Sequence, residues 1–260
     1  MLEVLERRDH VDQVPSVAYL NKDNKFILSS GVIREKQVDI FPRPDWDSIP
    51  LEDYIENGQI NGVNRGRSMP ILGTRGCPFQ CTFCSNPLMY TQRWIPRDPV
   101  DLVDEMEEFM AKYDVVNFDF QDLTAFVKKD WIIQFTQEII KRGLKITWQL
   151  PSGTRSEVFD REVASLVYQA GCRNLAFAPE SGDERVLKKV KKKVNLEHLE
   201  QSARDAVAAG LNVSVFIVIG FPIDNTESMQ KTARFLRKMA LIGVHDCVVS
   251  KFIPYPGSPL

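Results

Sequence analysis

Three closely spaced cysteines carry the clearest chemistry in this sequence. Cys77, Cys81 and Cys84 are separated by three and then by two residues, and Arg75 stands just before the first of them. Thiolates are the usual ligands of iron–sulfur clusters, and three of them can hold three corners of a cubane while the fourth iron stays open for chemistry. The spacing therefore predicts a three-thiolate metal site with a cation, Arg75, beside its negative charge.

A structural zinc site and a disulfide framework are the alternatives. Zinc needs four ligands, usually with a second Cys or His pair at a matching spacing, whereas the other candidates are scattered: His10, His198, His245, Cys172 and Cys247. The total of five cysteines is odd and no signal-peptide pattern begins the sequence, so we expect free thiols in a reducing cytoplasm. We expect Cys172 and Cys247 to be small buried residues rather than ligands of a second cluster.

Composition narrows the class of protein. The 260 residues are 43% hydrophobic and 26% charged, which is typical of a globular chain with one large α/β domain or two small ones. The 33 Lys and Arg residues oppose 35 Asp and Glu residues, so the chain lacks the basic field of most nucleic-acid-binding proteins. No segment is apolar over a length that could span a membrane. We therefore expect neither a nucleic-acid partner nor a membrane span.

The cysteines must be positioned by an α/β scaffold. From Met69 onward, short apolar runs alternate with amphipathic segments of helix length, which predicts a parallel sheet built from βαβ units. The expected strands are 70–74, 115–120, 146–150, 173–178, 212–219 and 247–252. The first expected helix begins at Asp98-Pro99, and the others span 129–142, 160–170, 184–191, 196–209 and 227–241. This is a partial (β/α)6 TIM-like barrel, whose active residues lie at the carboxyl ends of the strands.

Residues 1–69 differ from the rest of the chain. They lack a long periodic pattern and are interrupted by Pro42, Pro44 and Pro50, so we expect an irregular linker or remnant segment followed by a core domain of residues 70–260. Short apolar runs on either side of residues 21–24 predict a small hairpin.

The cysteine motif also carries a resemblance. Cys77, Cys81 and Cys84, with the aromatic Phe83 before the third thiol, match the CxxxCxxC signature of the radical S-adenosylmethionine (SAM) superfamily. The resemblance implies a 4Fe–4S cluster whose fourth iron chelates SAM, and reductive cleavage of SAM to a 5′-deoxyadenosyl radical that abstracts hydrogen from an unknown or small-molecule substrate. It also implies a one-electron reductant such as flavodoxin or ferredoxin.

Two further stretches resemble parts of the cobalamin-dependent branch of this family. Residues 41–50 are similar to the connector that follows an N-terminal cobalamin-binding domain, and residues 252–260 are similar to the PYPGTPL segment after the sixth strand. The chain has no DxHxxG cobalamin motif, so cobalamin would enter only through a domain that this chain lacks. We expect either a fragment, cut after strand six, or a member that has lost the cobalamin domain.

The resemblance assigns SAM contacts to two strand ends. Gln121 and Asp122 follow the second strand, where the family receives the amino group of SAM, and Asp122 is the favoured contact. The alternative for Asp122 is a cap of the following turn. Arg155 follows the third strand and has the fork geometry to pair with the SAM carboxylate; a surface arginine is its alternative.

Strands four and five supply the other expected contacts. Glu180 and Ser181 resemble the family's Glu-Ser-Gly segment, which touches the ribose or amino acid portion of SAM, although Ser181 has a helix cap as its alternative. Val218 and Gly220 lie where the family's GxIxGxxE stretch packs on adenine, and Gly220 is the one glycine of that pattern retained. A plain core strand explains Val218 equally well. Phe83 completes the expected cofactor-binding set.

Two alternatives for the function remain open. A methylthiotransferase of the same family would normally show additional cysteines upstream, and a non-catalytic iron–sulfur or redox protein would hold a cluster without cleaving SAM. The run of five lysines within residues 188–193 is interpreted as the solvated end of a helix, with attraction of an anionic partner as its alternative.

Overall fold

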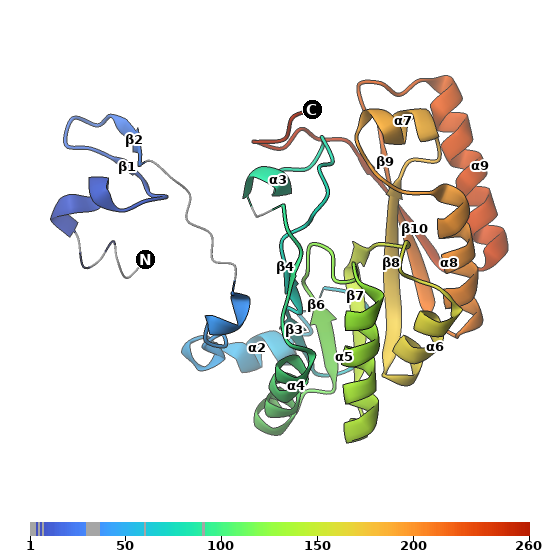
Figure 1. Cartoon of the computed structure of the whole chain (residues 1–260), viewed down its shortest axis with the longest axis horizontal. Coiled ribbons are helices and arrows are strands. Elements are labelled where there is room, and N and C mark those ends of the chain that lie inside the picture. Colours follow the sequence, from blue (N-terminus) through green and yellow to red (C-terminus); the bar gives the residue numbers. More distant parts are fainter. Residues whose placement is uncertain (1–3, 5, 7, 30–36, 60, 90–91) are drawn as a thin grey trace. The chain divides into compact units, whose positions relative to one another are not determined.

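The computed structural model describes residues 4, 6, 8–29, 37–59, 61–89 and 92–260. The chain forms two compact units, Met1–Gln37 and Val38–Leu260. In the first unit, the 3₁₀ helix η1 (Arg8–Gln13) precedes an antiparallel hairpin of β1 (Ala18–Leu20) and β2 (Phe26–Leu28), which confirms the predicted hairpin (Figure 1). Asn21 holds its turn, because Oδ1 accepts from the backbone N–H groups of Asp23 and Lys25.

A six-stranded parallel sheet forms the second unit, in the order β10-β9-β8-β7-β6-β3 (Figure 1). Its strands are β3 (Ser68–Ile71), β6 (Asn117–Phe120), β7 (Thr147–Thr154), β8 (Cys172–Glu180), β9 (Asn212–Ile219) and β10 (Asp246–Lys251). Because β3 and β10 are its two edges, the sheet is not closed. The predicted partial (β/α)6 barrel is confirmed.

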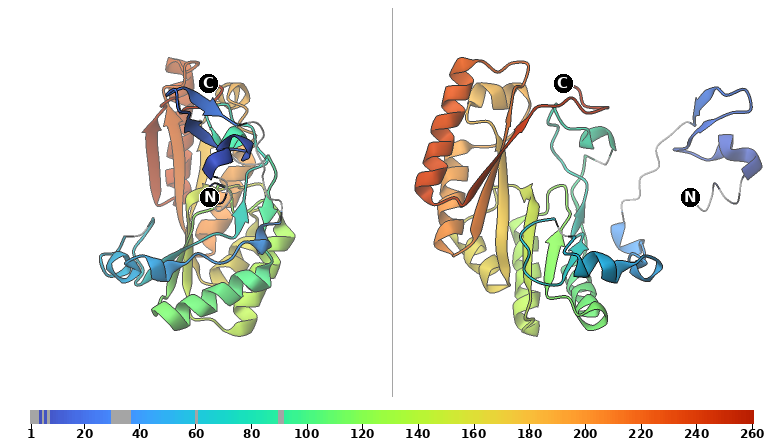
Figure 2. Two further views of the ribbon diagram at one scale, coloured as in Figure 1. Left: turned by 90° about the vertical axis from the view of Figure 1, so that its left-hand side faces the viewer. Right: turned by 180° about the vertical axis from the view of Figure 1, so that it is seen from behind.

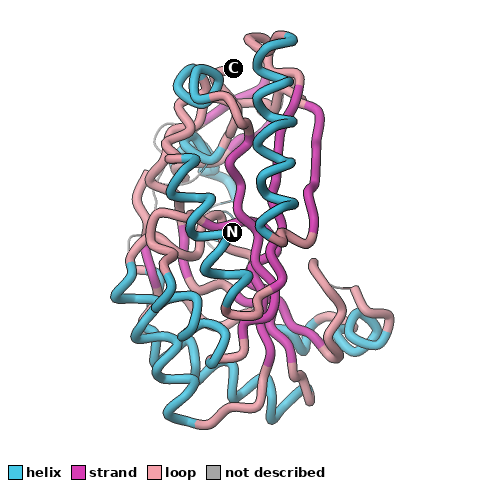
Figure 3. The backbone as a smooth tube through the Cα atoms, turned by 90° about the vertical axis from the view of Figure 1, so that its right-hand side faces the viewer, coloured by secondary structure: helices cyan, strands magenta, loops and turns pink. Residues whose placement is uncertain are grey.

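The long helices follow the strands and cover one face of the sheet (Figures 2 and 3). They are α4 (Pro99–Tyr113), α5 (Lys129–Arg142), α6 (Arg161–Gln169), α8 (Leu196–Ala208) and α9 (Thr226–Ile242), with the short α7 (Glu184–Lys189) after β8. Shorter elements are η2 (Val38–Ile40), η3 (Trp46–Ser48), α2 (Leu51–Glu56), α3 (Asn86–Met89) and the paired strands β4 (Thr74–Arg75) and β5 (Ile95–Pro96). Among the described residues, no helix is long and apolar enough to cross a membrane.

Capping residues explain why several predicted helix ends are accurate. The side chain of Asp98 accepts from the N–H groups of Val100 and Asp101, and α4 starts at Pro99, which has no N–H group that would need an acceptor. Gly143 ends α5 in the left-handed conformation. These local signals act within one turn of the helix, so they can be identified in the sequence.

Strands β7 and β8 run further than predicted. Pro151 and Gly153 after Leu150 indicate a strand end, yet β7 continues to Thr154 through a register shift against β8. β8 in turn continues to Glu180 through a register shift against β9. Such bulges bend a strand and redirect its side chains at the rim of a barrel. They carry both strands to the edge where the cysteine loop lies.

Aromatic side chains fill the space between the sheet and α5. The rings of Phe120, Phe126 and Phe135 lie 5.5–6.1 Å from that of Trp148, which is fully buried. The indole N–H of Trp148 donates to the carbonyl of Ala170 at 2.8 Å. This cluster fixes the middle of the sheet against its helical layer.

A polar ladder lies on the other face of the sheet. Asn117, Asp119 and Gln149 are buried, and Oδ1 of Asp119 accepts from the amide groups of both neighbours at 2.9 and 2.6 Å. Gln149 also bonds both backbone groups of Val63, and Arg65 donates to Asn174. The segment 61–65 therefore covers this polar face of the sheet.

That segment approaches the ladder closely. Gly62 has a φ of +153°, and a Cβ atom there would lie 2.7 Å from the side-chain amide of Gln149. A residue with a side chain would push the two apart. The boundary at residue 69 between linker and core domain stays a prediction, and β3 begins at Ser68.

Candidate active site

The three predicted cysteines line one cavity of about 140 Å³. The loop that carries them follows β4, and the carboxyl ends of β7 and β8 form the facing wall. The other side chains on this wall with ionisable groups are Arg155, Glu180 and Lys192. Their neighbours in the lining are Phe79, Phe83, Asn86, Leu123, Thr124, Ser152, Gly153, Thr154 and Ala178.

The thiols are partly withdrawn from water. Cys81 is 8% exposed, and burial raises the pKa of both Cys77 and Cys81. Lys192 and Arg155 act in the opposite direction, because each cation favours a thiolate and lowers the pKa of both cysteines. The cavity thus supplies three soft donors together with positive charge for an anionic metal centre.

A 4Fe–4S cluster fits this donor set by its chemistry. Three thiols, and no histidine, face one cavity, and thiolates are the ligands of such clusters. In the described part of the chain, no three Cys, His, Asp or Glu side chains are already drawn together at metal-ligand distances. The loop therefore gathers the thiols around a common space, and the ligand bonds themselves would complete the arrangement.

Glu180 and Lys192 form an ion pair in the wall of the cavity. Nζ of Lys192 lies 2.8 Å from Oε1 of Glu180, and the two side chains are 10% and 11% exposed. Glu180 has a φ of +70°, a left-handed conformation that costs a residue with a side chain about 1–2 kcal/mol. Strained residues of this kind cluster at functional sites. This conformation ends β8 at Glu180, whose carboxylate lines the cavity.

Lys192 was not among the residues predicted for the site. The interpretation of the lysine run as solvated holds for Lys191 and Lys193, which are exposed, but Lys192 points inward. The signal available in the sequence is weak. Val190, the one apolar residue in the run, is buried, and Lys192 follows it by two positions.

Arg155 lines the same cavity. Its guanidinium carbon sits 3.9 Å from the ring centroid of Phe79, which belongs to the cysteine loop. Nε also donates to a carboxylate oxygen of Glu157 at 2.9 Å. Arg155 is only 8% exposed, so the alternative of a surface arginine is wrong.

An apolar cluster supports the cysteine loop from behind. The Phe83 ring packs on Phe221 with a centroid distance of 5.5 Å, and Val218 and Leu260 pack against the same cluster. The backbone N–H of Leu260 donates to the carbonyl of Thr82 in the loop. Of these residues only Phe83 lines the cavity. Val218 is partly buried against this cluster, and its contact with adenine stays a prediction.

The remaining predicted contacts lie elsewhere. Gln121 lines a different cavity, and Gly220 lies beside Asp224, which accepts its N–H. Ser181 is buried, with Oγ 3.3 Å from that of Thr232, and accepts the N–H of Asp183, the residue that caps α7. These positions are near the strand ends but do not face the thiols in this conformation.

Asp122 is buried below the cysteine loop. Its carboxylate accepts from the N–H of Gly73 at 3.1 Å and from the hydroxyl of Thr74 at 2.5 Å. It is 2% exposed, and burial raises its pKa to about 6 although both hydrogen bonds lower it. Asp122 therefore fixes the turn between β3 and β4, from which the loop departs.

The raised pKa of Asp122 makes stability depend on pH. The folded protein holds this proton up to about pH 6, whereas an unfolded chain releases it near pH 4, so the contribution to stability falls as pH rises through this window. We expect the wild-type free energy of unfolding, relative to Asp122→Asn, to drop by about 1 kcal/mol between pH 5 and pH 7. Urea unfolding at both pH values measures it. Parallel pH profiles for the two proteins would contradict the expectation.

Comparison with models of known protein families identifies the family of this domain. The model described as the Radical SAM superfamily matches residues 71–236, which is well over half of the chain. The chain belongs to the radical SAM superfamily. Membership implies a 4Fe–4S cluster and SAM as cofactors, as the cysteine motif predicted, and the fold carries the core of a radical SAM enzyme.

Two curated relatives match much of the chain. An uncharacterized methyltransferase from Pyrococcus horikoshii is 28% identical over 86% of this chain and 46% of its own length. Cytidylyl-2-hydroxyethylphosphonate methyltransferase from Streptomyces wedmorensis is 30% identical over 72% of this chain and 35% of its own length. The chain thus spans less than half the length of these two relatives.

Solved structures agree on the fold. The radical SAM methyltransferase TsrM from Kitasatospora setae, with tryptophan and a SAM analog bound, has a TM-score of 0.78 at 17% identity and covers 99% of this chain and 50% of its own. The cobalamin-dependent radical enzyme OxsB gives a TM-score of 0.76 at 14% identity over 99% of this chain and 42% of its own. Both likenesses show a shared fold.

Proposed function

We propose that Cys77, Cys81 and Cys84 hold the 4Fe–4S cluster of a radical SAM enzyme that reductively cleaves SAM. The observation that carries this proposal is the single cavity shared by three thiols and by the carboxyl ends of β7 and β8. When bound there, the cluster supplies the electron that converts SAM into methionine and a 5′-deoxyadenosyl radical. Membership of the superfamily supports the assignment.

The chain's own residues would bind and orient SAM. Arg155 has a fork of donors for the SAM carboxylate, and Glu180 has a carboxylate oxygen, Oε2, that accepts no hydrogen bond from the described residues. We propose that this oxygen accepts from the ribose hydroxyls or the amino group of SAM. The apolar ring of Phe83 and the low exposure of Cys81 help to keep water from the thiols.

The reaction class is proposed from the relatives. Both curated relatives described above are methyltransferases by name, so we propose hydrogen abstraction or methyl transfer on a small-molecule acceptor. A one-electron reductant of the flavodoxin or ferredoxin type would supply the electrons, in a reducing compartment such as the cytoplasm where the thiols stay free.

The test is anaerobic reconstitution with iron and sulfide, followed by reduction and addition of SAM. We expect SAM to shift the EPR signal of the reduced protein and 5′-deoxyadenosine to be released. A protein that binds iron and sulfide but does not respond to SAM would be a redox protein and would contradict the proposal. A protein that takes up zinc in place of iron and sulfide would contradict the thiol assignment as well.

Lys192 offers a sharper test of the SAM site. In Lys192→Met the Glu180 carboxylate stays in a largely buried wall without its cation, so it loses the partner that orients it. We expect the affinity for SAM, measured by equilibrium dialysis on the reconstituted protein, to fall about tenfold. Lys193→Met is the matched control, because Lys193 is exposed in the same run. Equal effects of both changes would show a general charge effect and contradict a role for the ion pair.

A further inference from the structure

A second and larger cavity lies outside the cysteine site. It has a volume of about 430 Å³, within the range of about 300–1,000 Å³ that is typical of small-molecule sites. Phe41 and Trp46 of the linker segment form one wall. Ile71 at the end of β3, Leu72 directly after it, and Arg75 of β4 also line the cavity. None of the thiols lines it. This cavity is therefore distinct from the cavity that the thiols line, and of the predicted SAM contacts only Gln121 lies in its wall.

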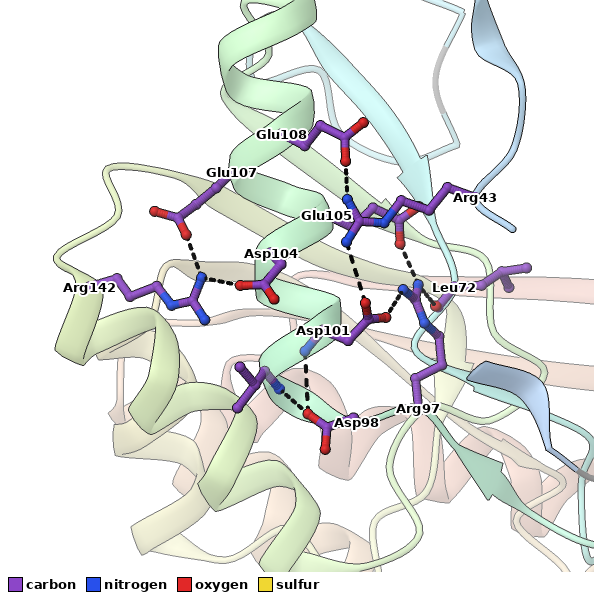
Figure 4. Close-up of polar contacts among 11 residues, drawn as sticks. Arg43, Leu72, Arg97, Asp98, Asp101, Asp104, Glu105, Glu107, Glu108 and Arg142 are labelled. Atoms are coloured by element: carbon purple, nitrogen blue, oxygen red, sulfur yellow. Dashed lines mark hydrogen bonds and ion pairs between the residues drawn. The ribbon is translucent and has the colours of Figure 1, made fainter. Parts of the chain in front are cut away.

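The charges around this cavity are mostly neutralised. Arg97 donates to Glu105, to Asp101 at 2.6 Å and to the Leu72 carbonyl at 3.1 Å (Figure 4). Arg43 pairs with Asp101 at 3.3 Å and with Glu108. These contacts use the acidic side chains of α4, so they fix the cavity wall without leaving a free cation there.

Arg75 is the exception. It lines this cavity and not that of the thiols, beside which we expected it. Its guanidinium carbon lies 5.1 Å from the ring centroid of Phe41, and it forms no ion pair with any residue that the structure describes. The cation therefore stands at an apolar cavity without a carboxylate partner. The buried indole N–H of Trp46 likewise has no acceptor in the described part of the chain. A wall with an unpaired cation and an unused donor suits an acceptor-rich, negatively charged ligand.

We propose that this cavity binds a small amphipathic anion, with an apolar body against Phe41, Trp46 and Leu72 and one carboxylate, sulfonate or phosphate group at Arg75. The apolar lining provides affinity through burial, and Arg75 selects the charge. The site does not depend on the cluster or on SAM, so its test stands apart from that of the proposed function.

Two fluorescent probes of similar apolar body test the proposal on the cluster-free 260-residue chain under reducing conditions. 8-Anilinonaphthalene-1-sulfonate carries one sulfonate, whereas N-phenyl-1-naphthylamine is neutral. We expect saturable binding of the sulfonate probe at one site per chain. Arg75→Gln should weaken the sulfonate probe about fivefold and leave the neutral probe unchanged, because only the charge contact is lost.

Matched variants separate the cavity from the general surface. Arg173→Gln removes another arginine that stacks on an aromatic ring, that of Tyr168, outside the cavity, and should leave both probes unchanged. Leu72→Asp places a charge in the apolar wall and should weaken both probes at least about tenfold, whereas Leu241→Asp alters an 82% exposed residue and should weaken neither. Thermal melts verify that each variant folds.

Two results would overturn the proposal. One is an equal loss of affinity for both probes in Arg75→Gln, which would show that the charge of Arg75 does not select the ligand. The other is binding that is the same in Leu72→Asp and Leu241→Asp, which would place the probes outside this cavity.

Discussion

Cys81→Ala should abolish the release of 5′-deoxyadenosine by the reconstituted, reduced protein. Cys81 is the most buried of the three thiols, at 8% exposure, and the two remaining cysteines cannot hold three corners of a cubane. We therefore expect complete loss, down to the level of protein that was never reconstituted. Chromatographic measurement of 5′-deoxyadenosine over time, together with iron and sulfide content, gives the result.

Cys247→Ala is the control for this experiment. Cys247 lies in β10 and lines neither of the two cavities described, so its replacement should leave both cluster content and 5′-deoxyadenosine release unchanged. If Cys81→Ala kept its iron, sulfide and activity, the assignment of the three cysteines would be wrong. If both variants lost activity, the loss would reflect handling of thiols in general.

Trp148→Ala should lower the free energy of unfolding by about 4–5 kcal/mol, the largest stability effect expected here. A fully buried aromatic residue replaced by alanine typically costs about 3–5 kcal/mol through lost burial and the cavity that remains. Trp148 also satisfies the carbonyl of Ala170, and that buried acceptor would lose its partner. Urea unfolding followed by circular dichroism measures the loss.

Two further variants separate the contributions of the ring contacts and of the hydrogen bond to this loss of stability. Trp148→Phe keeps most of the ring contacts and loses the hydrogen bond, so we expect a cost of about 1–2 kcal/mol. Tyr54→Ala removes an aromatic ring that is 53% exposed and should change stability by less than about 0.5 kcal/mol. A Trp148→Ala protein as stable as the wild type would show that the aromatic cluster does not carry the core.

Much of the fold was predictable because local signals agree with the tertiary structure. Both ends of α5 fall at the predicted residues, Lys129 and Arg142. The carboxyl end could be predicted because Gly143 adopts a left-handed conformation that few other residues tolerate. The carboxyl ends of β7 and β8 were not predicted. Their bulges depend on pairing between strands that are separate in the sequence. Within β7, Pro151 and Gly153 look like the end of a strand, so the sequence does not indicate that it continues.

The site was only partly predictable. Spacing identified the thiols, and the rule that active residues follow parallel strands identified the segments of Arg155 and Glu180. The rule does not say which way a side chain turns after the strand. Asp122 turns down to the β3–β4 turn and Gln121 lies at another cavity, while Lys192 enters from a loop after α7 that no strand-end rule covers.

The segment that covers the polar ladder has a consequence for dissecting this chain. Gln149 shares two hydrogen bonds with Val63, and Arg65 donates to Asn174. The side-chain amides inside the partial barrel therefore depend on residues that precede β3. A truncated chain that began between residues 65 and 68 would lack Val63, and the side chain of Gln149, which pairs with Asp119, would lose both of its backbone hydrogen bonds. The smallest self-sufficient version of this domain therefore starts no later than residue 61.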